Sequence, residues 1–329
     1  MPDAVDQGEA RRFIARQAQL EAKIAEWQAA APDIVRVDHV TSYAGLKVYG
    51  LTLSDWRAPR EGKRAQYIAQ PHAHEPGATA GMADVIEQLV TGHDLDGRPT
   101  SLDVDRLLSL AVITFNPIGN PQGREAAPVL WWDGSRYTND EFWCWMRGED
   151  PDHPGQMWER YDIWDRREVR APEPVGIVYE QIDAHRYVEP NRSRLSSYFC
   201  LFALLDAAHG YERWLDLHQT EFVQSEDTCE VLLPLEGLTQ GRIAEENLAW
   251  GRRIVARWQG AGMAARPEPR PTAYTGTQAA YLRAAWADLY QRLSHVTVEV
   301  KNNAPVATPQ FQRQCQALAI EASLEMLLE

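Results

Sequence analysis

Two histidines and a glutamate have the types and the spacing of a zinc site. His72 and Glu75 stand three residues apart in the segment PHAHEPG, and His218 follows the apolar run WLDL much later in the chain. A catalytic zinc ion takes three protein ligands of these kinds and keeps a fourth position open for water. Two ligands close in sequence and one from a remote strand therefore predict a catalytic zinc site.

The spacing alone is weak support, because the chain has nine histidines and an H-x-x-E match arises easily. An isolated pair of this kind is more often a surface hydrogen bond. His74 lies in the same loop, but in an extended loop its side chain points away from His72, and we assign it no metal role. Asp216 either orients His218 or is a polar residue of the sheet with a backbone partner of its own.

The elements that must carry these residues alternate between strands and helices. Apolar alternation and short apolar runs predict strands at 34–41, 46–54, 64–69, 111–115, 176–182, 214–217 and 296–300. Helical spacing predicts helices at 8–30, 78–91, 104–110, 196–208, 240–262, 277–293 and 309–328. This alternation is typical of a three-layer α/β/α fold around a central mixed, mostly parallel twisted sheet. Without repeats or low-complexity linkers, residues 1–329 are expected to form a single catalytic domain.

Residues 131–170 depart from this alternation. They contain six of the twelve tryptophans, among Asp, Arg, Gly and Pro, and show no clean period. We interpret the segment as a Trp-rich insertion. It is either a long connection held by its aromatic side chains or a wall or lid over a substrate pocket, since long ordered loops are often functional.

The composition excludes several classes of function. Acidic residues outnumber basic ones by 47 to 33, and the net charge of −14 repels nucleic acids and anionic membranes. No apolar run reaches the length of a membrane span, and the first residues lack the apolar stretch of a secretory signal. Four scattered cysteines suit a reducing compartment. We expect a cytoplasmic protein without nucleic-acid or membrane partners, and the oligomeric state stays open.

Seven segments, taken in order, resemble the zinc carboxypeptidase family, the carboxypeptidase A-like metallopeptidases. They are the entry strand Gly45–Ser54, the pair His72-x-x-Glu75, Asn116-Pro117-Ile118-Gly119, Glu189-Pro190-Asn191-Arg192, Leu217-His218, Tyr274 and Thr297-Val298-Glu299. The resemblance covers the chain from about Gly45 to Pro309. It implies the α/β/α fold named above and a bound Zn²⁺ held by His72, Glu75 and His218.

The resemblance also assigns roles to further residues. Glu299, an acidic residue on the otherwise apolar strand 296–300, would be the catalytic base that takes a proton from zinc-bound water. Asn191 and Arg192 would hold a substrate's terminal carboxylate, and Tyr274 would close over it. Glu189 stands where the family has Asp and would accept the second ring N–H of His72. Tyr281 would line the specificity pocket.

One family residue has no clear counterpart, the arginine that polarises the scissile carbonyl. The candidates are Arg160, Arg167, Arg170 and Arg186. We expect a metallocarboxypeptidase that acts on small peptides. The alternatives are an amidase or deacylase of the same superfamily acting on N-acyl amino acids or cell-wall peptides, and an inactive binding protein that keeps the fold.

Overall fold

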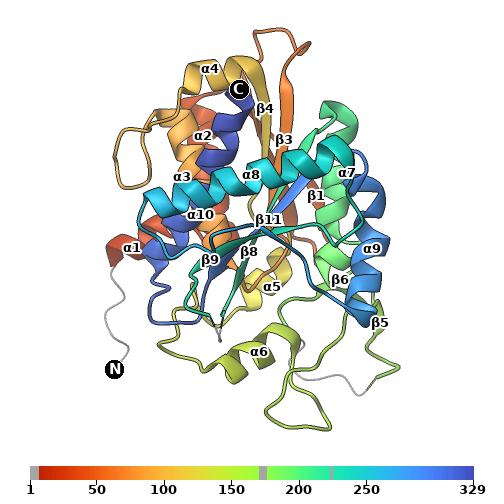
Figure 1. Cartoon of the computed structure of the whole chain (residues 1–329). Coiled ribbons are helices and arrows are strands. Elements are labelled where there is room, and N and C mark those ends of the chain that lie inside the picture. Colours follow the sequence, from red (N-terminus) through yellow and green to blue (C-terminus); the bar gives the residue numbers. More distant parts are fainter. Residues whose placement is uncertain (1–6, 170–175, 223–224) are drawn as a thin grey trace.

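The computed structural model describes residues 7–169, 176–222 and 225–329, and its centre is a mixed sheet between two layers of helices (Figure 1). Across the sheet the strands follow the order β1-β2-β4-β3-β8-β11-β9-β10. They comprise β1 Val35–Thr41, β2 Lys47–Leu53, β3 Arg64–Ala69, β4 Ala111–Asn116, β8 Arg213–Thr220, β9 Cys229–Leu233, β10 Arg270–Pro271 and β11 Ser294–Lys301. The central strands β4, β3, β8 and β11 are mutually parallel, which confirms the predicted fold class.

The helices divide between the two faces of this sheet (Figure 1). One face packs against α2 Gln17–Ala30, α3 Pro76–Thr91, α8 Gly241–Gly260 and α10 Pro309–Glu325. The other face packs against α7 Ser197–His209 and α9 Gly276–Tyr290. The remaining helices are α1 Gln7–Arg12, α4 Val104–Leu110, α5 Pro121–Ala126 and α6 Asn139–Arg147, with 3₁₀ turns η1 Pro190–Arg192 and η2 Met326–Leu328. A small second sheet joins β5 Trp164–Asp165, β7 Arg186–Val188 and β6 Glu180–Gln181.

Strand alternation decides which side chains reach the site. In β11, Val296, Val298 and Val300 belong to the core under α8 and α10. Successive side chains of a strand point to opposite faces, so Thr297 and Glu299 face the α9 side. The register pairs Glu299 with His218 on the parallel strand β8. The catalytic-base candidate and a ligand candidate therefore stand side by side on one face.

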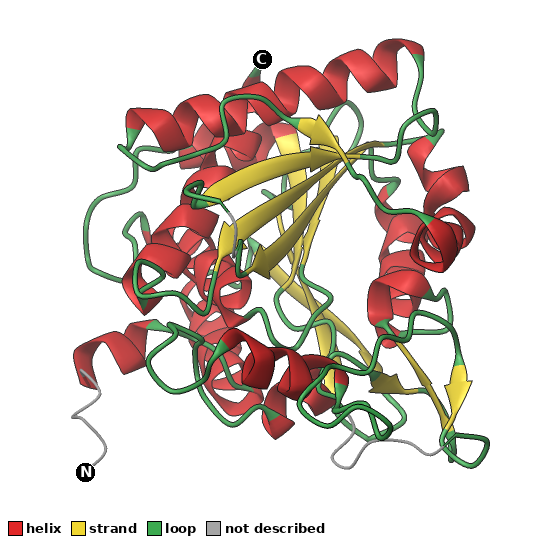
Figure 2. Cartoon of the chain, turned by 60° about the horizontal axis from the view of Figure 1, so that its bottom comes forward, coloured by secondary structure: helices red, strands yellow, loops and turns green. Residues whose placement is uncertain are grey.

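The strand order also explains where a ligand would bind. The chain leaves β3 for β4 on one side and later returns to β8 on the other side of β3. Such a reversal opens a crevice at the carboxyl ends of the two strands, where α/β proteins bind ligands. His72 and Glu75 follow β3, and His218 lies near the end of β8. Figure 2, turned so that the bottom of the molecule comes forward, shows the sheet with helices on both sides.

Three expectations about elements need correction. The helix expected at 8–30 is broken between α1 and α2, because the buried Phe13 packs edge-on against Trp131 and the Gln19 side chain accepts the backbone N–H of Arg16. The strand expected at 176–182 is reduced to β6, because the N–H groups of residues 177 and 178 bond to the carbonyls of residues 145 and 146. Strand β9 was not expected. No helix in the described ranges is long and apolar enough to cross a membrane.

Candidate active site

The structure brings the three predicted zinc ligands together. His72, Glu75 and His218 are all buried, and one potential ligand atom from each lies within 4.8 Å of the others. His72 Nδ1 lies 3.0 Å from Glu75 Oε1 and 3.2 Å from His218 Nδ1, and Glu75 Oε2 lies 3.3 Å from His218 Nδ1. No other group of this kind occurs in the described part of the chain.

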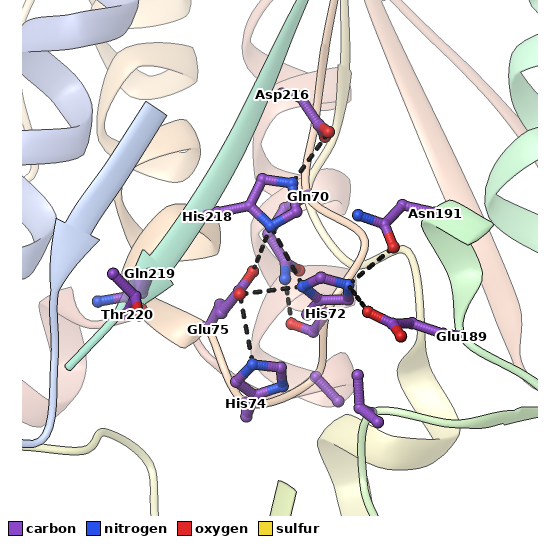
Figure 3. Close-up of polar contacts among 12 residues, drawn as sticks. Gln70, His72, His74, Glu75, Glu189, Asn191, Asp216, His218, Gln219 and Thr220 are labelled. Atoms are coloured by element: carbon purple, nitrogen blue, oxygen red, sulfur yellow. Dashed lines mark hydrogen bonds and ion pairs between the residues drawn. The ribbon is translucent and has the colours of Figure 1, made fainter. Parts of the chain in front are cut away.

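Each histidine presents its other ring nitrogen to a carboxylate (Figure 3). His218 Nε2 lies 2.9 Å from Asp216 Oδ2. His72 Nε2 lies 3.3 Å from Glu189 Oε1 and 3.1 Å from Asn191 Oδ1. Of the two readings of Asp216, the geometry supports the one in which it orients the ligand. Glu189, although one carbon longer than Asp, still reaches His72.

This arrangement fits a bound cation. With both Nε2–H groups donated to oxygen acceptors, the Nδ1 lone pairs of His72 and His218 converge with the Glu75 carboxylate. Three lone-pair donors then meet with no hydrogen between them, which a metal ion satisfies. Nitrogen and oxygen ligands about 2.0–2.1 Å from a tetrahedral zinc ion lie about 3.3 Å from one another. The two ring nitrogens lie 3.2 Å apart, and each lies 3.0–3.3 Å from one of the two Glu75 oxygens, which is near that value.

The charges of the cluster act on one another strongly. Burial alone raises the pKa of Glu75, but the rings of His72, His218 and His74 hold this pKa well below its usual range. Burial alone lowers the pKa of His218, but Asp216 and Glu75 raise it well above its ordinary value. Without a metal ion, protons therefore compensate the buried carboxylates, and a cation bound there must displace a proton from His218.

His74 is closer to the cluster than the extended-loop prediction allowed. Its ring stacks on the His72 ring, with centroids 5.2 Å apart and an interplanar angle of 18°. His74 Nε2 lies 3.3 Å from Glu75 Oε1. The prediction that it points away from His72 is wrong, because the chain turns at 72–75 and enters α3. Burial lowers the pKa of His74 to about 4, so it is a neutral neighbour of the ligands.

A buried arginine shapes the ligand loop. Arg124 is 1% exposed, and its guanidinium donates to the carbonyls of Ala15, His72 and Ala73 and to side-chain oxygens of Gln70 and Thr79. At the other end of the loop, Gly77 N–H donates to Gln219 Oε1 at 2.7 Å. The loop is thereby tied to α5 and to β8, which limits the freedom of both ligands that it carries.

Glu299 lines the same cavity as the three ligands. It is partly buried, and its Oε2 atom has no hydrogen-bond partner among the described residues. Burial raises the pKa of Glu299 to about 8; the carboxylates of Glu75 and Glu230 add to the rise, and His218 opposes it. A divalent cation nearby would lower this pKa. A carboxylate without a structural partner, beside a metal site, is free to carry a proton.

Arg192 lines this cavity with a buried side chain. It is 5% exposed, its Cζ lies 5.0 Å from the ring centroid of Tyr274, and its Nε lies 4.0 Å from Glu189 Oε1. Its Nε atom is buried and has no hydrogen-bond partner among the described residues, although desolvated donors normally have partners. Asn191 and Tyr274 line the cavity beside it. All three residues predicted to hold or cover a carboxylate are therefore brought together.

The Trp-rich stretch forms one wall of the cavity. Phe142, Trp143, Met146 and Arg147 of α6 line it, followed by Met157 and Tyr161. In Figure 1, α6 lies below the sheet, at the end where α5 follows β4. The geometry supports the interpretation of this stretch as a wall, and sequence reasoning assigned none of these six residues to the site.

Arg147 is the second guanidinium in the cavity, and sequence reasoning missed it. Its Nη1 donates to Glu189 Oε2 at 3.1 Å and to the carbonyl of Arg160 at 3.0 Å. The candidate arginines that the structure describes, Arg160, Arg167 and Arg186, instead pair with the nearby aspartates at 162, 165 and 183, and none lines the cavity. Arg170 lies outside the described residues.

Tyr281 does not line the cavity. The neighbouring positions Gln278, Leu282, Trp286 and Tyr290 of α9 do. Spacings of four and eight residues place the last three on one stripe of the helix, and Tyr281 is turned about 100° away from Leu282. The spacing of four residues between these positions is the sequence signal that could have predicted the lining in place of the single position Tyr281.

The comparisons with known proteins agree with this geometry. The zinc carboxypeptidase family model matches residues 20–197, which is more than half of the chain. No curated protein sequence matches.

Solved structures share the fold. A carboxypeptidase A from Helicoverpa armigera matches with a TM-score of 0.62 at 12% identity, covering 97% of this chain and 74% of that one. Thrombin activatable fibrinolysis inhibitor matches with 0.60 at 14% identity, covering 97% and 78%. A metallo-carboxypeptidase from Burkholderia cenocepacia matches with 0.56 at 15% identity, covering 94% and 68%. Taken with the family model, these findings lead to one conclusion: the chain belongs to the zinc carboxypeptidase family.

Proposed function

We propose that this chain is a zinc-dependent hydrolase that removes the C-terminal residue from small peptides. Enzymes of its family use zinc, and His72, Glu75 and His218 would hold the ion here. The observation that carries the proposal is Arg192, whose buried guanidinium shares one cavity with the ligand cluster and with Glu299 and has no hydrogen-bond partner at Nε among the described residues. A metal site beside a carboxylate anchor fits a substrate with a free C-terminus.

When bound, zinc supplies a Lewis acid that makes water a nucleophile near neutral pH and polarises a carbonyl oxygen. The Glu299 carboxylate accepts a proton from the attacking water and delivers it to the leaving amide nitrogen. Water is thereby added across the peptide bond, and the products are a shortened peptide acid and a free amino acid. The unpartnered Oε2 of Glu299 suits this shuttle, because no hydrogen bond has to break first.

Arg192 positions the substrate. A planar guanidinium binds a carboxylate through two parallel N–H···O bonds, which fixes orientation as well as charge. The stacked ring of Tyr274 covers one side of this group and excludes water from the pair. Arg147 is the arginine best placed to meet the scissile carbonyl, because it is the other guanidinium that lines the cavity in the described ranges.

Metal analysis and a matched pair of peptides test the proposal. The purified protein should contain one zinc ion per chain and should hydrolyse an N-acylated dipeptide with a free C-terminus, but not its C-terminal amide. Arg192→Ala should lower kcat/KM for the free peptide by roughly 30-fold or more, as expected when a charged hydrogen-bonded contact of about 2–3 kcal/mol is lost, with zinc content unchanged.

The neighbouring Arg194 provides the control. It is exposed, pairs with Asp288 at 2.6 Å, donates to the backbone carbonyl of Ala285 and does not line the cavity. Arg194→Ala should leave kcat/KM within about twofold of the parent value, as expected of an exposed ion pair. Equal losses on free and amidated peptides in Arg192→Ala would remove the anchoring role. Cleavage of N-acyl amino acids in place of peptides would favour the deacylase alternative.

A further inference from the structure

Two stacked aromatic rings of α9 close the floor of the site cavity. Trp286 and Tyr290 both line it, with ring centroids 5.5 Å apart and an interplanar angle of 16°. Both side chains are almost fully buried, and the rings of Trp214 and Phe199 pack behind Trp286. A floor backed by close-packed core cannot retreat to admit a larger ligand.

This floor lies next to Arg192, the residue proposed to bind the substrate carboxylate. Trp286 Nε1 donates to the backbone carbonyl of Asn191 at 2.8 Å, and Arg192 is the next residue. A carboxylate on Arg192 belongs to the last residue of the substrate. In this binding mode we place the side chain of that same residue against the α9 side of the cavity, which Leu282 and the two floor rings line next to the Asn191–Arg192 segment.

The wall on this side has one charged residue of its own, Glu299 of β11, beside Arg192. Apart from Arg192 and Glu299, the described residues that line it from β9, β11, α9 and the segment before α9 are uncharged, among them Leu232, Thr272, Gln278 and Thr297. Glu221 also lines the cavity, from the segment that follows β8. A charged side chain held against Leu282 and the two aromatic rings would lose its hydration next to apolar groups.

The cavity is also small. Its volume is about 250 Å³, below the roughly 300–1,000 Å³ of sites that enclose drug-sized ligands. Part of this volume lies over the ligand cluster and is needed for the scissile bond and water. The space left beside Leu282 and above the aromatic floor suits a short side chain.

We propose that the site selects peptides whose C-terminal residue has a small, uncharged side chain, and that Leu282 above the Trp286–Tyr290 floor sets this limit. The inference rests on the proposed carboxypeptidase function and specifies its substrate class. Leu282 is a specificity residue in this view. It takes no part in the chemistry, so its replacement should change which substrate is preferred rather than whether one is cleaved.

A panel of N-acylated dipeptides that differ only in the last residue tests the inference on the zinc-loaded full chain. For the parent protein, kcat/KM with C-terminal alanine should exceed that with phenylalanine by at least tenfold. It should exceed the values with lysine and glutamate by about 100-fold. Leu282→Ala should raise the ratio of kcat/KM for the phenylalanine peptide to kcat/KM for the alanine peptide at least tenfold. One methylene in an apolar pocket already changes discrimination by about 10–200-fold.

Leu289→Ala is the matched control. Leu289 is buried in the same helix but does not line the cavity, so its replacement should leave the ratio within twofold. A parent preference for lysine, glutamate or phenylalanine overturns the inference, as does an unchanged ratio in Leu282→Ala. The parent panel decides the matter alone if a variant fails to fold. Cleavage of no dipeptide at all refutes the proposed function itself, and with it this inference.

Discussion

The contact between Asp216 and His218 allows a quantitative test of the metal site. Asp216 is 2% exposed, its Oδ2 lies 2.9 Å from His218 Nε2, and its Oδ1 accepts the hydroxyl of Tyr198 at 2.6 Å. Both oxygens therefore accept a hydrogen bond. Asp216→Asn keeps the shape of the side chain but replaces one of these two acceptors with a donor.

The size of the expected loss in zinc affinity depends on which of the two contacts the substitution removes. If the amide oxygen stays with Tyr198, the amide nitrogen faces His218 Nε2 and favours the tautomer with its proton on Nδ1, which cannot bind a metal. If the amide oxygen instead turns to His218, the charge-assisted hydrogen bond to Nε2 becomes a neutral one, at a cost of about 1–2 kcal/mol. Partners of this kind typically contribute 10–100-fold to metal affinity. We expect a loss of about 10–100-fold in zinc affinity.

Competition with a chromophoric chelator at pH 8 would measure this loss. Tyr198→Phe, which keeps the carboxylate, should change the zinc affinity by less than about threefold. The double variant Tyr198→Phe/Asp216→Asn should recover part of the loss, because the amide oxygen is then free to face His218. Non-additivity of this kind is the mark of a shared partner.

The pH dependence gives a second readout. Asp216 and Glu75 raise the pKa of His218, so below that pKa zinc must displace a proton and its affinity rises with pH. Without the carboxylate at 216, the pKa falls and the dependence on pH should weaken. Zinc affinity within twofold of the parent in Asp216→Asn, with an unchanged pH slope, would refute the assigned role of Asp216.

Three further predictions concern other parts of the molecule. Glu299→Gln should retain zinc and lose at least about 100-fold in kcat, because the proton shuttle is gone; substantial remaining turnover would exclude Glu299 as the base. Burial raises the pKa of Glu180 to about 7. Its contribution to the free energy of unfolding is therefore fully present below the unfolded pKa of about 4.5. About 3 kcal/mol of this contribution is lost as the pH rises through 7. In urea unfolding, the free energy of unfolding of Glu180→Gln minus that of the parent should therefore be larger at pH 8 than at pH 5. An equal difference at both pH values would contradict this cause. Arg124→Met should lower the free energy of unfolding by more than about 3 kcal/mol, because it leaves several buried acceptors without a donor; a loss below about 1 kcal/mol would show that water replaces the guanidinium.

The meeting of His72, Glu75 and His218 in one cluster was predictable from the sequence because its signals are local. His72 and Glu75 follow a short apolar strand that the structure reproduces at Arg64–Ala69, and His218 lies in β8, just after the apolar run that was expected to deliver it. Glu299 stood out as an acid among valines, and the parallel register beside His218 accounts for its position. The α/β/α fold follows from the same alternation of strands and helices.

The walls of the site were not predictable in the same way. Arg147 lies in the Trp-rich stretch without a period, and its place depends on a contact with Glu189, 42 residues later. The stacking of His74 on His72 depends on a tight turn that an extended-loop assumption misses. Tyr281 shows the limit of carrying over one position, because a helix turns each neighbour by about 100°.

The pairing of β3 with β8 has a consequence for how the molecule matures. The two histidines of the cluster are 146 residues apart in sequence, and they meet only when those two strands have paired. A chain that has emerged only as far as α3 contains His72 and Glu75 but not His218, so a metal ion cannot find all three predicted ligands there. Loop closure over such a distance is slow compared with helix formation. Metal uptake should thus report completion of the sheet, and any truncation that removes β8 should abolish it while leaving the first hairpin and α3 able to form.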